Sequence, residues 1–526
     1  MWLEEVDEIL RGYLPYYLLI VLPIFIIVSP ANPVSASSEF PVYRMQHYDL
    51  HGVAHGCRSA GINLEARSLT SWSSPRHCVV AKLKDLTIEN FRNIKLKAGA
   101  LLIMLPEDLS NLSTEDRQHF LVLENALIAQ EISIPVYFVH YSNTNDMSKS
   151  AAEAMFSSIA ANGYQIVVSS SNPSIKTDAK VATVQGHLAG YSADGKISTI
   201  AIVAHYDSFG IAPDLSFGAD SNGSGVVILL ELVRLFSGLY SEVKTRGKYN
   251  IVFLLTGGGK INYQGSKKWL EDQLDALDGS IIQEASYVMC LDTLATSDSI
   301  YMHVSKPPKE GSQAAMFFKE LKAASEGYPS VTADGVHKKI NLADDILGWE
   351  HERYSIRRLP AFTLSTLRNH KDFQRSTILD TRENLNFDRL VRNTKIIAEA
   401  LARHDINTEH IEAWVDYLIS QPRSPQLLSN KDNTLVTILK DTFNKYLRDV
   451  KISYAIPDKR DPDFQFYEVT RGMVNVYSVK PAVFDLVLTL AIILYLGAIY
   501  LFIDHFSLLY GIACALTASR KVKTNN

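Results

Sequence analysis

The stretch VAHYDSFGIAPDLSFGADSNGSG, residues 203–225, decides how the rest of the chain is interpreted. It continues the apolar run 200–204, whose β-branched residues and short length predict a buried strand. The strand ends in His-Tyr-Asp at 205–207, and a loop then carries Asp220 to an apolar helix expected over 226–236. A lone His-x-Asp is usually structural. The joined pattern favours a metal or catalytic site at the edge of an α/β sheet.

Alternating apolar runs predict the fold class. Strands are expected at 98–105, 134–139, 200–204, 250–255, 286–291 and 360–364, with helices at 116–132, 226–240 and 266–277. This alternation predicts an α/β protein whose mostly parallel central sheet is flanked by helices on both faces. We expect this sheet in a lobe over 191–404, and a smaller N-terminal α/β lobe over 39–190.

The length, net charge and cysteine content restrict the class of protein. A length of 526 residues predicts two or three domains. A net charge of −5 gives no basic footprint for nucleic acid, so no direct nucleic-acid partner is expected. The four Cys lack CxxC or finger spacing, which argues against a structural zinc finger. Cys57 and Cys78 could form one disulfide in an oxidising compartment, and Cys290 is expected to be buried in a strand.

Both ends of the chain carry apolar segments. Residues 1–38 predict a signal peptide cut after Ala36, and an uncleaved signal anchor is the alternative. The run 486–503 is long enough to span a bilayer, which predicts a transmembrane helix at 484–504. Basic residues in the tail at 505–526 favour a cytosolic C-terminus, hence a single-pass type I protein with lumenal lobes. Between lobe and membrane, 405–480 is interpreted as a helical stalk. The sequon at Asn111 predicts glycosylation, whereas Asn222 lies in the site loop.

Four longer segments carry a family resemblance. They read GADSNGSGV at 218–226, TGGGKINYQGSKKWLED at 256–272, HVSKPP at 303–308 and WEHERYSIRRLPAFTLS at 349–365. From about Glu39 to the C-terminus the chain resembles the nicastrin-like branch of the zinc aminopeptidase and transferrin receptor superfamily. The enzymes of that superfamily hold two co-catalytic metals, and the superfamily also contains the inactive ectodomains of nicastrin and the transferrin receptor.

The resemblance implies a site. The enzymes present, in order, a His-x-Asp, a bridging Asp, a Glu-Glu pair, a further Asp and a late His. Carried over, His205 matches the first ligand and Asp207 its supporting partner, Asp220 the bridging residue and Asp292 the later Asp. One metal at His205, Asp220 and Asp292 is one possibility. The other is that these side chains bond among themselves and with Lys260.

Three required positions have changed. Gly259 stands where the general base belongs, Lys260 where the metal-binding Glu belongs, and Ser376 where the late His belongs. His370 could compensate only if its loop were remodelled. Glycine takes no proton, and an ammonium repels a metal ion. Two unit charges about 4 Å apart interact by roughly 4 kcal/mol at an effective dielectric near 20, so we expect Lys260 to pair with Asp220 in place of a second metal.

Other motifs carry weaker signals. The glycines at 257–259 do not match a phosphate loop. Glu350-His351 is interpreted as structural support. The positions Trp349, Arg353 and Arg357 favour a partner-contacting helix face and a structural role equally.

These losses predict a pseudo-aminopeptidase with no catalytic residue and no cofactor. By resemblance we expect a non-catalytic scaffold of the endoplasmic reticulum membrane. It would assemble with a Nomo-type lumenal protein and a small multipass membrane protein at the ribosome-associated translocon, where multipass membrane proteins are inserted and assembled. The alternatives are a one-metal zinc aminopeptidase, with Glu231 or Asp214 imagined as base, and a module that binds peptides without cleaving them.

Overall fold

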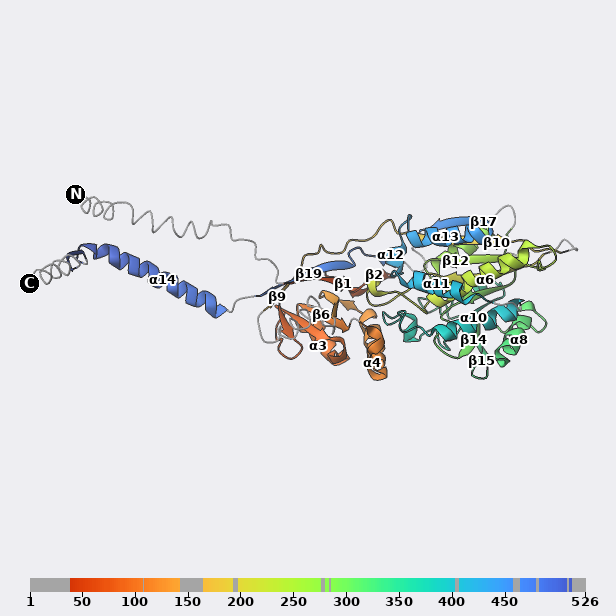
Figure 1. Ribbon diagram of the computed structural model, residues 1–526, viewed down its shortest axis with the longest axis horizontal. Coiled ribbons are helices and arrows are strands. Elements are labelled where there is room, and N and C mark those ends of the chain that lie inside the picture. Colours follow the sequence, from red (N-terminus) through yellow and green to blue (C-terminus); the bar gives the residue numbers. More distant parts are fainter. Residues whose placement is uncertain are drawn as a thin grey trace, which may run out of the picture.

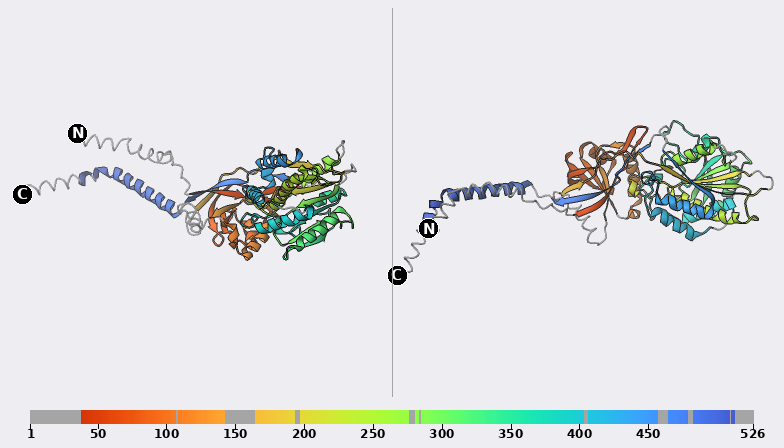
Figure 2. Two further views of the ribbon diagram at one scale, coloured as in Figure 1. Left: turned by 45° about the vertical axis from the view of Figure 1, so that its right-hand side comes forward. Right: turned by 90° about the horizontal axis from the view of Figure 1, so that it is seen from above.

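The computed structural model describes residues 38–106, 108–141, 164–192, 197–275, 280–282, 285–402, 406–456, 464–478, 482–508 and 510–512. The expected signal segment and the basic tail residues Arg520, Lys521 and Lys523 lie outside these ranges. Figure 1 shows two bodies side by side, with helix α14 (Ala482–Asp504) projecting away from the smaller one. Both views of Figure 2 place the smaller body between α14 and the larger one.

The larger body is built on an eight-stranded sheet in the order β15-β14-β16-β13-β11-β12-β10-β17. Strands β16, β13, β11 and β12 run parallel at its centre, which confirms the expected sheet, and antiparallel pairs extend it at β14–β16, β12–β10 and β10–β17. The strands are β10 (Val181–Leu188), β11 (Thr199–His205), β12 (Asn250–Thr256), β13 (Ala285–Leu291), β14 (Ser299–Val304), β15 (Thr332–His337), β16 (Ala361–Ser365) and β17 (Arg448–Ala455).

Helices cover both faces of this sheet. In β11, Ile202 and Ala204 face one way and pack in a cluster with a first set of helices, which is given at the end of this paragraph. Ala201 and Val203 pack with Trp269 and Tyr354, which belong to the second set. Burial on both faces explains why the run 200–204 is apolar throughout. The first set is α6 (Gly223–Ser241), α8 (Gln313–Glu326), α10 (Phe387–Ala402), α11 (Thr408–Ile419) and α13 (Thr434–Tyr446), and the second is α7 (Gln264–Leu274) and α9 (His351–Ile356).

The smaller body is a closed barrel with two helices, α3 (Ile88–Lys97) and α4 (Thr114–Ile128), beside a four-stranded sheet. The barrel order is β1 (Ser38–Arg44), β19 (Arg471–Ser478), β9 (Tyr164–Val168), β4 (Ile62–Ser68), β5 (His77–Lys82), β6 (Ala100–Pro106) and β8 (Val136–Tyr141). The small sheet is β18 (Phe464–Phe466), β2 (His47–Leu50), β3 (Val53–Cys57) and β7 (Glu131–Ile132). The short helices of the chain are η1 (Leu83–Asp85), η2 (Leu109–Asn111), η3 (Pro213–Leu215), η4 (Phe373–Arg375) and α12 (Pro425–Leu428).

The cysteines differ from one expectation and match another. Cys57 and Cys78 are free and buried in separate hydrophobic clusters, so the disulfide considered between them is not formed. Cys78 lies in the cluster to which all seven barrel strands contribute, whereas Cys57 packs with the helices outside it. Cys290 is buried in β13, as expected.

The segment 405–480 differs from the helical stalk expected from its spacing. Helices α11 and α13 pack on the large sheet, but the chain then forms three strands. Strand β17 extends the large sheet beside β10, β18 joins the small sheet, and β19 closes the barrel between β1 and β9. Because these partners lie hundreds of residues away in the sequence, local periodicity could not identify them. The segment therefore ties the two bodies together.

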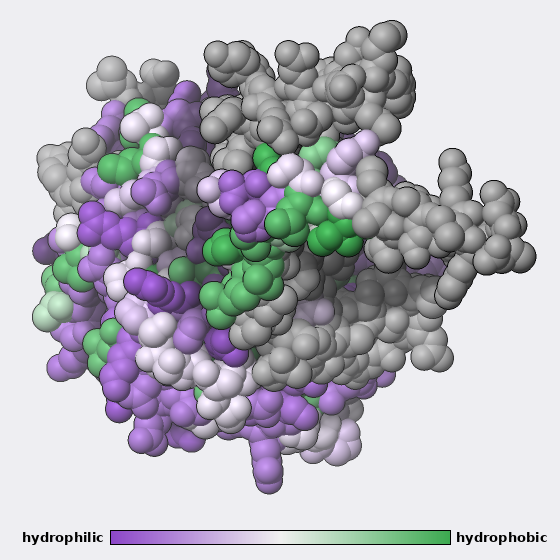
Figure 3. Space-filling view, turned by 90° about the vertical axis from the view of Figure 1, so that its left-hand side faces the viewer, coloured by the Kyte–Doolittle hydropathy of each residue, from purple (hydrophilic) through white to green (hydrophobic). Residues whose placement is uncertain are grey.

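Among the described residues, one helix is long and apolar enough to cross a membrane, judged by length and composition alone, and a bent pair of helices is a second candidate if the pair is counted as one span. The single helix is α6, but 78% of the residues in its apolar window are buried inside the protein, as in the core helix of a large domain. The pair is Ile492–Asp504 and Phe506–Ile512, which is bent by 65°. The described side chains of α14 include many exposed apolar ones, among them Leu486, Ile493 and Leu501. Figure 3 views the molecule from this end and shows hydrophobic residues gathered there.

A buried carboxyl group on α4 connects the two bodies. Oε1 of Glu124 accepts the backbone N–H of Ile211 at 2.9 Å and of Ile378 at 3.1 Å, while Oε2 is buried without a hydrogen-bond partner. Both acceptor contacts reach loops of the larger body. Burial raises the pKa of Glu124 from 4.5 to about 7.

This geometry predicts a pH-dependent stability. Because the folded pKa of Glu124 is raised, its stabilising effect is full below the unfolded pKa and is lost as pH rises through about 7. Glu124→Gln keeps an acceptor oxygen but cannot ionise. We expect it to be more stable than the wild type at pH 8, by up to about 3 kcal/mol, with the difference vanishing near pH 5. Thermal unfolding between pH 5 and 8 measures this, with the exposed Glu131→Gln as control. Identical pH profiles for Glu124→Gln and the wild type would contradict it.

Candidate functional site

The register of the parallel strands brings the predicted site residues to one edge of the large sheet. His205 in β11 is paired with Thr256 in β12, and Val203 with Cys290 in β13. Asp207, the loop 257–260 and Asp292 follow the ends of these strands. The carboxyl ends of parallel strands are where α/β proteins build their ligand sites.

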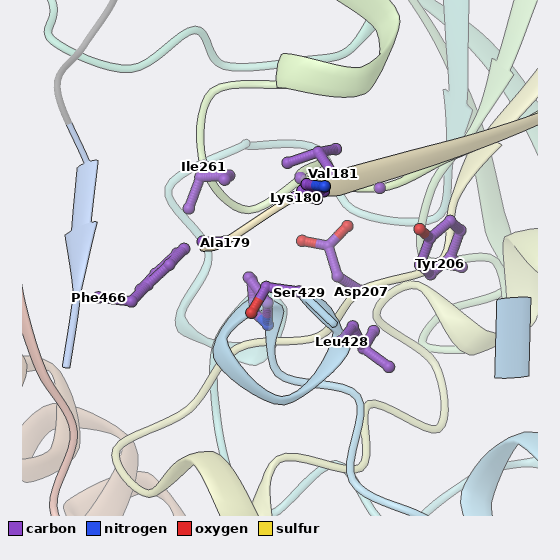
Figure 4. Close-up of a pocket in the computed structure, with 12 residues that line it drawn as sticks. Ala179, Lys180, Val181, Tyr206, Asp207, Ile261, Leu428, Ser429 and Phe466 are labelled. Carbon is purple, nitrogen blue, oxygen red and sulfur yellow. The ribbon is translucent and has the colours of Figure 1, made fainter. Parts of the chain in front are cut away.

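Asp207 fixes the loop that carries the altered positions. Its Oδ1 accepts the N–H of Gly259 at 2.7 Å and its Oδ2 accepts the N–H of Lys260 at 2.8 Å. Figure 4 shows this carboxylate next to Tyr206, with Leu428 and Ser429 nearby. The expected role of Asp207 as the partner of His205 is therefore wrong. Glu350 lies at that ring instead, with Oε2 3.4 Å from Nδ1 of His205.

Glu350 is held by the sheet edge. Its Oε1 accepts hydrogen bonds from the hydroxyls of Thr256 at 2.8 Å and Ser266 at 2.5 Å, and the side chain is fully buried. His351 next to it bonds Thr363 at 2.9 Å, and burial lowers the pKa of His351 to about 3. These contacts give Glu350-His351 the supporting role expected of it.

Gly259 packs directly against the His205 ring. A Cβ atom at Gly259 would lie 2.2, 2.3 and 2.4 Å from three carbon atoms of that side chain, distances that real Cβ atoms do not adopt. His205 is completely buried and its ring contacts Tyr263 and Glu350, so any movement of the ring would disturb these contacts. The position where the enzymes carry their base therefore has no room for any side chain.

Asp292 is engaged by a cation of the protein itself. Its Oδ2 accepts a hydrogen bond from Nη2 of Arg375, and its Oδ1 accepts one from the Thr293 hydroxyl at 2.7 Å. Burial acts to raise the pKa of Asp292, but the charges of Arg375, His205 and Lys260 outweigh burial and hold that pKa well below its usual range.

The guanidinium of Arg375 is locked in place by neutral groups. It donates to the carbonyls of Gly348 at 3.1 Å and His370 at 3.0 Å, and to the hydroxyl of Tyr263 at 3.1 Å. It also lies over the ring of Trp349, 4.4 Å from its centroid. A fixed positive charge therefore covers Asp292, the carboxylate that the resemblance had assigned to a metal.

Lys260 does not form the expected ion pair with Asp220. Its Nζ donates to the Ser221 hydroxyl at 2.7 Å and to the carbonyl of Arg375 at 2.9 Å, and no ion pair links it to an acid within the described ranges. Burial, followed by the charge of Arg375, lowers the pKa of Lys260 to about 8. The predicted pairing of Lys260 with Asp220 is therefore wrong, and the cation that pairs with a carboxylate of the expected site is Arg375, on Asp292, which the sequence analysis did not identify.

Asp220 meets a second carboxyl group instead of a cation. Its oxygens accept the N–H of Ala295 at 2.9 Å and the hydroxyl of Thr296 at 2.5 Å. Asp380 accepts the backbone N–H groups of Asp220 and Ser221 at 2.8 and 2.7 Å. Burial raises the pKa of Asp220, and burial together with Asp220 raises the pKa of Asp380 to about 7. Burial and the neighbouring carboxyl group thus both favour the neutral form of Asp380.

The late histidine is not replaced. Ser376 is partly buried, and His370 contacts Trp349, with ring centroids 6.5 Å apart, and Nζ of Lys338 at 3.3 Å. Burial, followed by the charge of Lys338, lowers the pKa of His370 to about 4. Among the described residues, no hydrogen bond, ion pair or ring contact joins His370 to His205 or Asp220, so the loop has not been remodelled to supply a ligand.

The remaining candidate residues have structural partners. Trp349 is 2% exposed and Arg353 8%, so they cannot form a partner-contacting face with the exposed Arg357. Glu231 bonds Arg234 and His410, and Asp214 bonds Arg471, so neither imagined base is available. Asn222 is buried and caps α6 at the N–H of Gly225.

The residues present do not fit a catalytic metal. One feature favours a ligand: Nε2 of His205 is buried without a hydrogen-bond partner. However, Asp292 is paired with Arg375, and Asp220 is bonded to Ala295 and Thr296. Within the part of the chain that the structure describes, no three His, Cys, Asp or Glu side chains come together as metal ligands.

Known proteins place the chain in a family. Residues 184–401 match the model of peptidase family M28. The human BOS complex subunit NCLN is 42% identical over 99% of this chain and 100% of its own length, and the zebrafish protein is 42% identical over 98% and 99%. Nicalin from Caenorhabditis elegans is 29% identical over 95% and 96%. The chain belongs to the nicalin family. This membership confirms the resemblance drawn from the motifs.

Among solved structures, an aminopeptidase from Aneurinibacillus sp. strain AM-1 aligns with 14% identity over 71% of this chain and 84% of its own, at a TM-score of 0.30.

Sequence reasoning missed the residues that close the site. Arg375 directly precedes the lost histidine position, and a basic residue there was the available signal. Arg423 was also missed. It is fully buried and donates to the carbonyls of Tyr206, Phe217 and Gly218, which shapes the loop before α6.

Proposed function

We propose that this protein is a non-catalytic scaffold, an aminopeptidase-like body whose former metal site has become part of its core. The observation that carries the proposal is the Arg375 guanidinium on Asp292, with no room for a base at Gly259. General acid–base catalysis typically contributes about 10²–10⁴-fold in rate, and this site offers no residue for it at the expected position.

The apolar segment and the relatives support a proposal for the setting of this scaffold. Helix α14, at the far end of the small body, is the candidate membrane anchor, single-pass and type I, in the endoplasmic reticulum with both bodies lumenal. Since family members are named BOS complex subunits, we extend the proposal to a multisubunit assembly. Its partners would be a Nomo-type lumenal protein and a small multipass membrane protein at the translocon, acting in multipass protein insertion. The exposed Asn111 would carry a glycan.

An activity assay tests the first part. The purified full chain in mild detergent should release no fluorophore from aminoacyl fluorogenic substrates, with or without added zinc. The control is His205→Ala, which removes the one ligand-like side chain. Turnover by the wild type that disappears in His205→Ala would establish the one-metal aminopeptidase and overturn the proposal.

Co-purification tests the second part. The tagged full chain, extracted in mild detergent, should carry a large lumenal protein and a small multipass protein in constant ratio, identified by mass spectrometry. The mature N-terminus, read in the same experiment, shows whether the segment 1–38 has been removed. Recovery of the chain alone under conditions that preserve other membrane assemblies would contradict the assembly.

A further inference from the structure

A cavity of about 430 Å³ opens over the closed site, between the two bodies. The small body contributes Tyr48 and Ile128, and the larger body contributes Lys260 and the loop 370–376. It lies beyond the carboxyl ends of the parallel strands, the place where α/β proteins hold ligands. This space is large enough for a small ligand.

One wall of this cavity is aromatic. Tyr48 packs against Phe209 and Phe464, with ring centroids 5.8 and 6.0 Å apart, and all three line the cavity. Phe373 lies at the opening and is 38% exposed. Such a wall stabilises an aromatic or branched apolar group of a ligand.

Another part of the lining carries a positive charge without a direct ion pair among the described residues, and the carboxylates of Asp207, Asp292 and Asp380 attract it only from a longer distance. Lys260 lines the cavity, and both of its acceptors, the Ser221 hydroxyl and the Arg375 carbonyl, are neutral. An ammonium has three donors, so one remains. The charge of Arg375 is matched by Asp292, and the lining residues Lys371 and Asp372 carry opposite charges. A buried ammonium without a directly bonded anion is energetically costly, and a ligand anion would accept the remaining N–H of Lys260.

We propose that this cavity binds a carboxylate that bears an aromatic or branched apolar group, with Lys260 as its counter-ion and the Tyr48–Phe209–Phe464 wall around the apolar group. The C-terminal residue of a peptide and a free organic acid both have this chemistry. A peptide N-terminus does not, because its ammonium would be repelled by Lys260. The inference goes beyond the scaffold role and stands whether or not the assembly forms.

Calorimetric titration of the full chain in detergent tests the proposal. The probes are acetyl-leucyl-phenylalanine, its C-terminal amide and 3-phenylpropanoate. The peptide acid should bind saturably, and about 10-fold or more tighter than the amide, because only the acid forms the charge-assisted bond. Tighter binding of the peptide acid than of 3-phenylpropanoate assigns the site to peptide C-termini, and the reverse assigns it to free organic acids. Equal binding of acid and amide, or no binding of either, overturns the proposal.

Variants separate the two walls. Lys260→Met should abolish the preference for acid over amide, whereas Phe373→Ala, at the exposed opening, should weaken both ligands alike. Lys268→Met is the matched control, because Lys268 pairs with Asp272 on the surface of α7 and does not line the cavity. If Lys260→Met still preferred the acid over the amide, Lys260 would not be the counter-ion of the ligand. Should Lys260→Met fail to fold, Phe373→Ala still tests the proposal, because it should weaken the binding of both ligands alike.

Discussion

Arg375→Met is expected to lower the free energy of unfolding by about 3–5 kcal/mol, the usual cost of leaving one member of a buried ion pair without its partner. Methionine approximates the length of the arginine stem and loses the guanidinium. Asp292 is fully buried, so its carboxylate would lose the hydrogen bond from Nη2 and would have no water to replace it. The contact of the guanidinium with the Trp349 ring would be lost as well.

The pH dependence of this effect has a definite sign. The pKa of Asp292 is depressed in the folded state, so its pairing contributes stability above the unfolded pKa. That contribution is lost as pH falls through the folded pKa. The stability difference between wild type and Arg375→Met should therefore be largest at neutral pH and shrink in acid.

Thermal and denaturant unfolding of the full chain in detergent measures the effect. Arg357→Met is the matched control, since Arg357 is exposed and lies 3.8 Å from Glu271, and such surface pairs contribute about 0–1 kcal/mol. Combining Arg375→Met with Asp292→Asn should cost less than the sum of the two single changes, because the double variant leaves no unpaired charge. Equal losses in Arg375→Met and Arg357→Met would show that the guanidinium has not taken the metal's place.

The fold could be predicted where the pattern is local. The run 200–204 identified β11 because both of its faces are buried, and the apolar helix after Asp220 identified α6 for the same reason. The strands β17 and β19 were missed because they are half-exposed edge or barrel strands that complete sheets begun hundreds of residues earlier. The pairing partners of these strands cannot be predicted from local sequence, because they lie far away in the chain as well as having a weak apolar pattern.

The site shows a similar division. The motif comparison located the altered positions Gly259, Lys260 and Ser376, and the structure places Gly259 and Lys260 at the sheet edge beside His205. It could not show which cation fills the space, because Arg375 and Asp292 are 83 residues apart and meet only through the path of the loop after β16. Lys260 was the nearest cation in the motif, but its amine is directed to Ser221 and to a carbonyl.

The substitution Gly259→Glu places a carboxylate at the position of the general base. It should not confer peptidase activity, and it should destabilise the protein by about 4 kcal/mol or more. The added Cβ would fall 2.2 Å from Cγ of His205, so the fully buried ring or the loop held by Asp207 must move. Overpacking of this kind costs about 1–3 kcal/mol. The carboxylate adds the cost of a buried charge, and no metal site adjoins it in the described structure.

A pair of alanine variants isolates the steric part of this prediction. Gly259→Ala adds only the colliding Cβ, so it should lose about 1–3 kcal/mol without any charge effect. Gly238→Ala, within helix α6, adds the same atom where nothing lies within 4 Å, and should gain about 0.5–1 kcal/mol from helix propensity. Unfolding midpoints of the three proteins give the comparison. If Gly259→Ala were as stable as the wild type, the loop would have room for a side chain at this position. Packing against His205 would then not be the reason why the base is absent.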